Sequence, residues 1–454
     1  MKRYKYNLIC LLTILITGMV SCKDYLDLKP DSSLAVPKTL NDCQLILDDY
    51  AINSNYPSDG EAAADNYYVT DALFNSMNVM DTKTNYSWDA KAEHGVQWSA
   101  PYSIVYSANL VLKVLNDLPD TGYEYQRIKG TALFHRAFAF YHLAQLFTKP
   151  YNSQTAGSDL GIILRTDPDV SIKYNRSTLQ ETYDKIIKDL LEAKNLLPAT
   201  STIQTRPNKV AVNAALARVY LTINNFTEAG KMANEALAVK DQLMDFKTVA
   251  VIPRYNPEVI FQGVTVAISP SRSFLSPAAA KIDENLYNAY QSNDKRKTLF
   301  FRANPAPNNN TFFFKGSYDG LVNTTSLFTG LATDELYLIR AECFARSGST
   351  EQALSDLNTL MRTRYDETFV PYTAINAGIA LDKILEERRK ELVFRNLRWT
   401  DIRRLNNESK YAITLTRPKN TFPYTPLIPG DLRYAMLIPT LQETSLSNIQ
   451  QNPR

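Results

Sequence analysis

Hydrophobic positions recur at helical spacing over most of the chain, and this pattern fails in two long stretches. Apolar residues three and four positions apart are typical of amphipathic helices, which bury one face. The spacing predicts helical pairs near residues 125–240 and 333–405, where the last long helix covers residues 383–405. Residues 50–100 and 241–330 are rich in Asn, Asp, Ser, Pro and aromatic residues without sustained periodicity. Such long segments predict irregular loops, and their aromatic content favours ordered ones.

Small and aromatic residues recur at matching offsets within the helical regions. Small residues let two antiparallel helices approach closely, and an aromatic ring fills the space beside them. This arrangement is typical of the tetratricopeptide repeat, whose period is about 34 residues. A further helix, 125–147, has its expected partner at 179–197, across a loop rich in Gly, Pro and Asp. The matching positions are Leu216-Ala217, Tyr220, Ala229 and Ala236; Arg340-Ala341, Phe344, Ala353 and Leu360; and Arg136-Ala137 with Phe140.

The N-terminus has the features of a secretory signal. Lys2, Arg3 and Lys5 precede the apolar run 8–20, and Ser21-Cys22 follow it. A basic start, a short apolar core and a small residue before a cleavage point define such a signal, and the run is too short to span a bilayer comfortably. A cysteine at this point is the bacterial lipoprotein arrangement, although an ordinary signal peptide with a chance cysteine is the alternative. We therefore expect a signal peptide over residues 1–21, lipidation at Cys22, and one domain over residues 22–454, held to the membrane by its lipid anchor alone.

Charge and cysteine content restrict the possible functions further. Of the 50 basic residues, three lie in the signal, so the mature chain has 47 basic and 47 acidic residues. This balance provides no basic stripe for a nucleic acid. Cys43 and Cys343 are the two cysteines beyond Cys22. They could pair in an oxidising compartment, but Cys343 falls within an apolar helical stripe, and this favours a buried thiol.

Several motifs, taken in order, resemble those of the SusD/RagB family of outer-membrane lipoproteins. The resemblance runs from Cys22 nearly to the end of the chain, and the segment around Glu387 is its most specific part. The motifs are Cys22-Lys23-Asp24-Tyr25-Leu26-Asp27; residues 136–147 followed by Pro150-Tyr151; residues 336–342; Glu387-Arg388-Arg389-Lys390-Glu391-Leu392 with Phe394, Arg398, Trp399, Asp401 and Arg403-Arg404; Leu437-Ile438-Pro439; and Gln451-Asn452-Pro453.

The resemblance implies a fold, a place and a partner. The fold would be mostly α, with about four tetratricopeptide-like hairpins forming a right-handed scaffold and with long irregular loops that hold a ligand. The protein would be anchored by lipid at the cell surface of the outer membrane and would deliver an oligosaccharide, or a peptide as in RagB-like members, to a SusC-like TonB-dependent transporter. Family members do not chemically alter their ligand, so the resemblance implies neither enzyme activity nor a cofactor.

The sequence departs from the family pattern at one turn. Arg395-Asn396 stand where the family usually has Glu-Gly. Asn tolerates a left-handed backbone better than most residues, so the turn can survive the change. The ion pair that the glutamate would make there is left in doubt.

The irregular segments hold residue types suited to sugars. Flat rings stack on the apolar faces of pyranoses, while amides, carboxylates and guanidinium groups bond to hydroxyls. Each ring could instead only pin its loop to the helical body; at least one of Tyr86, Trp88 and Trp98 is expected to meet ligand. The candidates are Asp65, Asn66, Tyr67, Tyr68, Tyr86, Trp88 and Trp98, with Arg272, Phe312 and Tyr318 in the later loops, near Phe274, Phe313 and Phe314.

The sequence contains little that indicates a catalytic or metal-binding site. Glu387 and Glu391 are one helical turn apart among many arginines, which favours an ion-pair network over a glycosidase pair facing across a cleft. His135 and His142 are seven residues apart on one helix and are expected to be packing residues rather than metal ligands. Two alternatives of other classes remain. A protein-binding scaffold of the envelope predicts buried Trp88 and Trp98 without an exposed aromatic cleft, and a hydrolase predicts facing carboxylates in a pocket.

Overall fold

The structure is a computed structural model that describes residues 37–119, 121–266, 272–320, 326–440 and 449–454. The signal sequence and Cys22 lie outside these ranges, so cleavage and lipidation stay predictions. The chain from Leu40 to Arg454 forms one compact unit.

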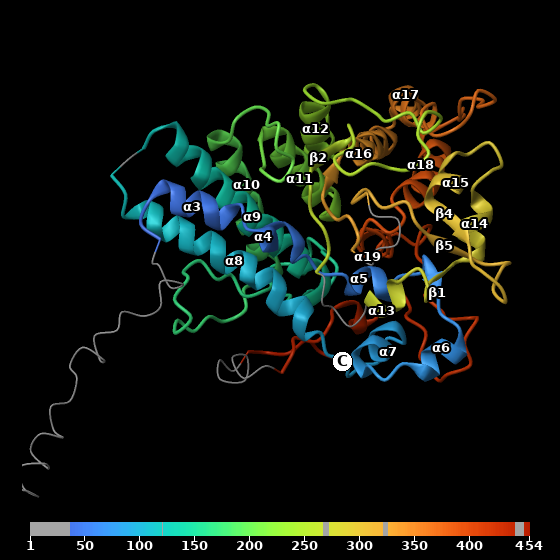
Figure 1. Cartoon of the computed structure of the whole chain (residues 1–454), viewed down its shortest axis with the longest axis horizontal. Helices are drawn as coiled ribbons and strands as arrows, with labels where there is room; N and C mark the ends of the chain where they lie inside the picture. The colour runs from blue at the N-terminus through green and yellow to red at the C-terminus, as the bar shows by residue number, and fades with distance from the viewer. Residues whose placement is uncertain (1–36, 120, 267–271, 321–325, 441–448) are drawn as a thin grey trace, which may run out of the picture. The chain divides into compact units, whose positions relative to one another are not determined.

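Long helices packed in sequence form the scaffold (Figure 1). Helix α10 packs on α11, α12 packs on α16, and α16 packs on α18, so the pairs form a continuous series. The fold class is confirmed as mostly α with tetratricopeptide-like hairpins. The helices are α3 (Leu40–Leu47) and α8 (Gly95–Asn116); the pairs α9 (Tyr123–Phe147) with α10 (Leu179–Leu196), α11 (Lys209–Thr222) with α12 (Phe226–Leu237), and α16 (Thr333–Arg346) with α17 (Thr350–Met361); and α18 (Ala377–Glu391) with α19 (Arg398–Leu405).

Caps and close approaches explain these helices locally. Thr178 and Glu181 form a capping box at the start of α10, and the Asn225 side chain accepts the backbone N–H of Glu228 at the start of α12. Between α12 and α16, a Cβ added at Gly230 would come within 3.1 Å of the Cys343 Cβ. A small residue is therefore needed at this crossing. Cys343 and Cys43 are both buried free thiols, as the sequence favours.

Helix α9 is the centre of the core. It is buried around its whole circumference from Thr131 onward, because neighbouring helices cover its faces. His135 and His142 belong to this buried stretch, which agrees with a packing role. Burial lowers the pKa of His135 to about 3, so its imidazole is neutral at physiological pH.

The two irregular regions contain short elements rather than loops alone. Within the described residues, three two-stranded antiparallel ladders form: β1 with β3 and β2 with β6 join distant segments, and β4 with β5 joins neighbouring ones. The short elements α5, α6, α7, α13 and β1 lie in the lower right of Figure 1, below α16 and α18. The short elements of the described chain, inside and outside these two regions, are α4 (Tyr50–Ser54), α5 (Asp59–Ala63), β1 (Tyr67–Tyr68), α6 (Asp71–Ser76), α7 (Met80–Tyr86), β2 (Val259–Phe261), α13 (Arg272–Leu275), β3 (Lys281–Ile282), α14 (Glu284–Ala289), α15 (Arg296–Phe300), β4 (Phe301–Ala303), β5 (Phe312–Phe314), β6 (Leu331–Ala332) and the 3₁₀ turn η2 (Leu432–Tyr434).

The predicted single helix over 383–405 is wrong. The structure has two helices here, because α18 ends at Glu391 and α19 begins at Arg398. Phe394 and Asn396 have φ angles of 55° and 58°, which a right-handed helix cannot contain. The apolar residues of this turn continue the helical spacing, so periodicity alone could not reveal the break.

Candidate functional site

The aromatic residues that the sequence selects in residues 50–100 are largely buried. Tyr86, Trp88 and Trp98 are 0%, 5% and 6% exposed, and Tyr67 is also buried. The Trp88 indole N–H donates to the Ala63 carbonyl at 2.9 Å, and the Tyr86 hydroxyl accepts the Val69 N–H at 3.1 Å. These rings therefore hold their segments against the body, and their contact with a ligand stays a prediction.

The neighbouring polar candidates are engaged within the protein. Asp65 accepts Arg398 at 2.6 and 2.8 Å and Arg389 at 3.1 Å. Burial acts to raise the pKa of Asp65, but the two guanidinium groups outweigh it and hold this pKa well below its usual range. The Asn66 amide donates to Glu61 at 2.7 Å. Tyr68, the next residue but one, is half-buried.

The later candidates share a hydrophobic cluster with the earlier ones: Tyr67, Tyr86 and Tyr318 belong to it, and Phe312 packs against it. Phe312 is half-buried and stacks on Tyr287 with ring centres 3.7 Å apart. Tyr318 is buried, and its hydroxyl donates to Glu258 at 2.5 Å. Arg272 begins α13. Phe312 and Tyr318 do not line the surface hollows beside Trp88 and Trp98.

Trp88 forms part of the wall of a surface hollow of about 740 Å³, called here the Trp88 hollow. Tyr424, which is half-buried, packs edge-on to Trp88 with ring centres 5.9 Å apart. Arg433 is held in place by both oxygens of Asp431, at 2.9 and 2.6 Å. The hollow therefore combines aromatic rings with carboxylate, guanidinium and hydroxyl groups. Its lining residues are Ser87, Trp88, Asp89, Ala90, Pro423, Tyr424, Thr425, Gly430, Asp431, Leu432, Arg433 and Arg454.

Trp98 forms part of the wall of a second hollow, of about 430 Å³, called here the Trp98 hollow. It lies between α8 and the segment 163–174, which is the loop that connects α9 to α10. Trp98 packs edge-on to Phe147 with ring centres 4.9 Å apart, and its ring centre lies 4.8 Å from that of Tyr102. The structure thus places the two candidate tryptophans in different hollows.

Sequence reasoning missed Tyr424, Arg433 and Tyr106, each of which lines one of these hollows. Tyr424 lies more than 300 positions from Trp88, so no local pattern connects them. Tyr106 lies on α8 and is 47% exposed, which only the folded structure reveals.

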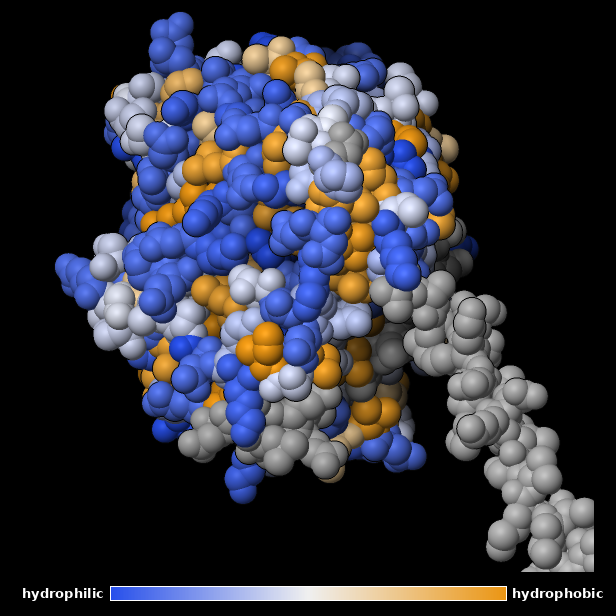
Figure 2. All heavy atoms as spheres, turned by 90° about the vertical axis from the view of Figure 1, so that its left-hand side faces the viewer, coloured by the Kyte–Doolittle hydropathy of each residue, from blue (hydrophilic) through white to orange (hydrophobic). Residues whose placement is uncertain are grey.

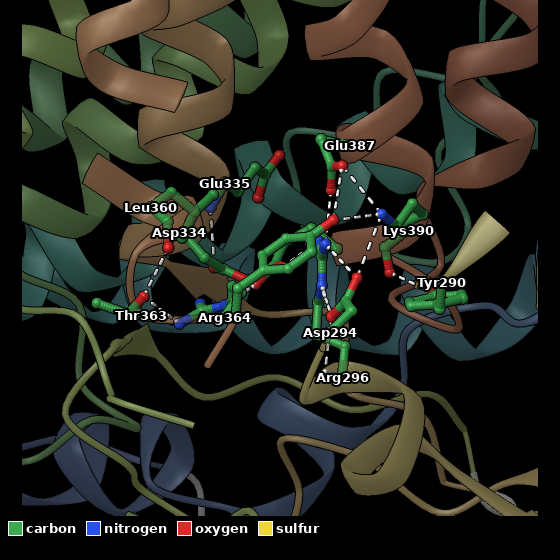
Figure 3. Close-up of polar contacts among 12 residues, drawn as sticks. Tyr290, Asp294, Arg296, Asp334, Glu335, Leu360, Thr363, Arg364, Glu387 and Lys390 are labelled. Carbon is green, nitrogen blue, oxygen red and sulfur yellow. Dashed lines mark hydrogen bonds and ion pairs between the residues drawn. The ribbon is translucent and has the colours of Figure 1, made fainter. Parts of the chain in front are cut away.

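The charged residues of α18 form a buried ion-pair network, as the sequence favours (Figure 3). Arg296 contacts Asp294 at 2.7 Å, Glu387 at 2.6 Å and Glu391 at 3.0 Å. Lys390 contacts Asp294 at 3.2 Å and Glu387 at 2.9 Å. All these side chains are almost completely shielded from solvent, so the network ties α18 to α15 and to the segment before it.

Three carboxylates near this network lie close enough together to suggest a metal site. Glu258, Asp334 and Glu391 place ligand atoms within 4.8 Å of one another. Arg364 donates to Glu258 at 2.8 Å and to Glu391 at 2.7 Å, and Arg395 donates to Asp334 at 2.9 Å. These guanidinium groups already neutralise the carboxylates, so the geometry favours ion pairing here over cation binding.

Acid should weaken this network. Burial acts to raise the pKa of Glu387, but Arg296 and Lys390 outweigh it and lower this pKa to about 2. A carboxylate with a lowered folded-state pKa stabilises the fold above its unfolded pKa and loses that effect as pH falls. We expect the free energy of unfolding to drop by about 3 kcal/mol between pH 5 and pH 2 from Glu387 alone. Urea unfolding at several pH values in this range should show that the free energy of unfolding of Glu387→Gln depends less steeply on pH than that of the unmodified protein. An equally steep dependence would contradict the role given to Glu387.

The fold defines a helical-repeat protein with surface hollows beside Trp88 and Trp98. A family model described as "Starch-binding associating with outer membrane" matches residues 24–221, and one described as "SusD family" matches residues 332–426. The chain belongs to the SusD/RagB family.

Related proteins and solved structures are similar to this protein over most of its length. SusD-like protein P2 of Formosa agariphila is 24% identical over 480 residues, which cover 89% of this chain and 91% of that protein. A SusD superfamily protein of Bacteroides thetaiotaomicron has a TM-score of 0.75 at 22% identity, covering 92% of this chain and 100% of that one. A laminarin-binding SusD-like protein has a TM-score of 0.67 at 16% identity, covering 90% and 97% of the two chains. These structures share the fold.

No helix within the described part of the chain has both the length and the apolar character required to cross a membrane.

Proposed function

We propose that this protein binds an oligosaccharide at the cell surface and delivers it, chemically unaltered, to a SusC-like TonB-dependent transporter in the outer membrane. Cys22 would carry the lipid anchor. The family assignment supports this proposal, because the model that matches residues 24–221 is described as starch-binding and associated with the outer membrane. A laminarin-binding protein shares the fold.

The Trp88 hollow is the observation that carries the proposal. Its volume of about 740 Å³ falls within the range of ligand pockets, and it brings aromatic rings and polar groups to one surface. Tyr424 offers part of a ring face, while Asp89, Thr425 and Arg454 are exposed at the edge of the hollow. Rings for sugar faces and charged or hydroxyl groups for sugar hydroxyls are the two requirements of a glycan site.

Three other functions make different demands. A peptide-binding member would use the same hollow with another ligand. A protein-binding scaffold expects buried tryptophans, which both Trp88 and Trp98 are, but it does not require the half-buried Tyr424 or the exposed Tyr106 beside them. A hydrolase expects carboxylates with raised pKa values in an open pocket. Burial raises the pKa of Glu258 to about 7, but this carboxylate is 0% exposed and bonded to Arg364.

Replacing Tyr424 by alanine should weaken glycan binding by about tenfold, because one ring face of the hollow is lost. Calorimetry of the full chain in lipid nanodiscs against starch and laminarin oligosaccharides and a peptide panel would measure this. Tyr123, which is 61% exposed on α9, provides a matched control because it does not line the hollow. Tighter binding of peptides would favour the RagB-like alternative. Unchanged glycan affinity of Tyr424→Ala would remove the Trp88 hollow from the proposal.

The anchor and the partner need a separate experiment. Cys22→Ala should release the protein from the membrane fraction, because several acyl chains are needed for stable anchoring. Native purification of the unmodified protein should recover a large TonB-dependent β-barrel. Recovery of envelope assembly proteins in place of that barrel would favour the scaffold.

A further inference from the structure

The Trp98 hollow has a construction and a charge that differ from those of the Trp88 hollow. We propose that it is a second saccharide site, selective for sugars that carry a carboxylate or a sulfate group. The choice of a saccharide rests on the proposed function, but the site is separate, and the experiment below tests the two independently.

The wall formed by residues 163–174 is fixed to α8 by specific bonds. The Tyr102 hydroxyl donates to the Ile163 carbonyl at 2.8 Å and accepts the Ile163 N–H at 3.1 Å. The Asn109 amide donates to the Arg165 carbonyl at 2.9 Å. Farther along α8, Lys113 contacts Asp167 at 3.4 Å. The hollow is therefore a built feature of the fold, because α8 holds the segment at three successive positions.

Apolar side chains remain exposed around this hollow. Tyr106, Val170 and Ile172 are 47%, 79% and 39% exposed. Figure 2 looks onto the left-hand side of Figure 1, where α8 lies, and hydrophobic residues reach that surface in patches between hydrophilic ones. Exposed apolar groups at the rim of a concave site are typical of ligand contact. A ligand with an apolar face is thus expected, and a pyranose ring has one.

The charges of the hollow favour an anionic ligand. Its lining contains the cations Arg165 and Lys173 and the carboxylate of Asp167, which Lys113 already contacts. Within the described residues, no carboxylate lies at ion-pair distance from Arg165 or Lys173. The nearby Asp169 carboxylate instead accepts the backbone N–H and the hydroxyl of Ser171.

Arg165 is also preorganised. Its guanidinium group lies over the Tyr174 ring at 5.1 Å, and its Nη2 donates to the carbonyls of Asp169 and Ile172 at 3.1 and 3.4 Å. A guanidinium group fixed in this way loses little freedom when it meets a planar carboxylate or a sulfate. The resulting site would place a sugar ring against Tyr106 and its anionic group toward Arg165 and Lys173.

The three tryptophans of the chain make a direct test possible. In the full chain, labelled with 5-fluorotryptophan and held in lipid nanodiscs, Trp98 reports the second hollow and Trp88 the first. Trp399, which is buried, gives a reference signal. Trp88→Phe and Trp98→Phe assign the signals. The probes are trigalacturonate, which carries carboxylates; a carrageenan tetrasaccharide, which carries sulfates; and neutral laminaritetraose.

A saturable shift of the Trp98 signal is expected with at least one of the acidic probes, at an affinity at least about threefold above that for laminaritetraose. The two acidic arms reveal which anionic group is preferred. No shift with either acidic probe, or equal affinity for the neutral one, would overturn the proposal. Benzoate binding as tightly as the acidic sugars would overturn the saccharide class. Movement of the Trp88 signal alone would leave the Trp88 hollow in place as a glycan site and would overturn the proposal for the Trp98 hollow.

Two variants with matched controls test the contacts. Tyr106→Ala should weaken binding of the acidic probe by about tenfold, and Lys173→Gln by about threefold at low salt with no effect on the neutral probe. Tyr123→Ala and Lys188→Gln alter exposed residues outside the hollow and should leave affinity unchanged. If both Tyr106→Ala and Lys173→Gln kept the affinity of the unmodified protein for the acidic probe, the proposed placement of the sugar against Tyr106 and Lys173 would be overturned.

Discussion

Replacing Arg296 by methionine should lower the free energy of unfolding by about 3 to 5 kcal/mol, because three buried carboxylates would lose their shared cation. Arg296 is 0% exposed and bonds to both oxygens of Asp294, and it also contacts Glu387 and Glu391. Methionine fills much of the same space and leaves the negative charges facing one another. Lys390 remains beside Asp294 and Glu387 but does not replace the contact to Glu391.

Urea unfolding of the full chain would measure this loss. The control is Lys383→Gln, which removes a 2.6 Å pair with Glu386 whose side chains are 35% and 48% exposed. An exposed pair of this kind contributes at most about 1 kcal/mol. A loss below about 1 kcal/mol for Arg296→Met would mean that the network adapts to the missing charge, and it would refute the view that α18 is held to α15 by this arginine.

The helical scaffold could be predicted because its signals are local. The offsets around Ala217 and Ala229 reflect the contact of two helices that follow each other directly in the sequence, α11 and α12. The partner of helix α9 could also be found, although a long loop separates them, because α10 has its own amphipathic pattern.

The hollows could be predicted only in part. Composition identifies the segment that contains Trp88 and Trp98, but it cannot distinguish a ring that faces solvent from one that anchors a loop. Trp88 meets Tyr424, and Trp98 meets the segment 163–174, through contacts that only the folded chain brings together. Chain-distant contacts of this kind leave no periodic trace in the sequence.

The turn at Arg395 and Asn396 illustrates the same limit within a recognised motif. The sequence leaves the ion pair of this turn in doubt. The structure has an ion pair in which the turn supplies the positive charge instead of the negative one: Arg395 donates to Asp334 at 2.9 Å. Its guanidinium group also lies over the Tyr318 and Phe328 rings at 4.2 and 4.6 Å. Asn396 takes the left-handed conformation, and its amide donates to the Pro57 carbonyl at 2.8 Å. Compensation by residues far along the chain preserves the turn.

Arg395→Glu, which restores the residue usual in the family, should therefore destabilise this protein by at least about 4 kcal/mol. The new carboxylate would be buried beside Asp334 and close to Glu335, and both are themselves buried. Arg395→Met removes the pair without adding a charge and should cost less, whereas Asn396→Gly should stay within about 1 kcal/mol because glycine accepts a positive φ angle. Urea unfolding of the three variants ranks these losses. If Arg395→Glu destabilised the protein no more than Arg395→Met, like-charge repulsion at this turn would be negligible. Asp334 would then not require a positive charge at position 395.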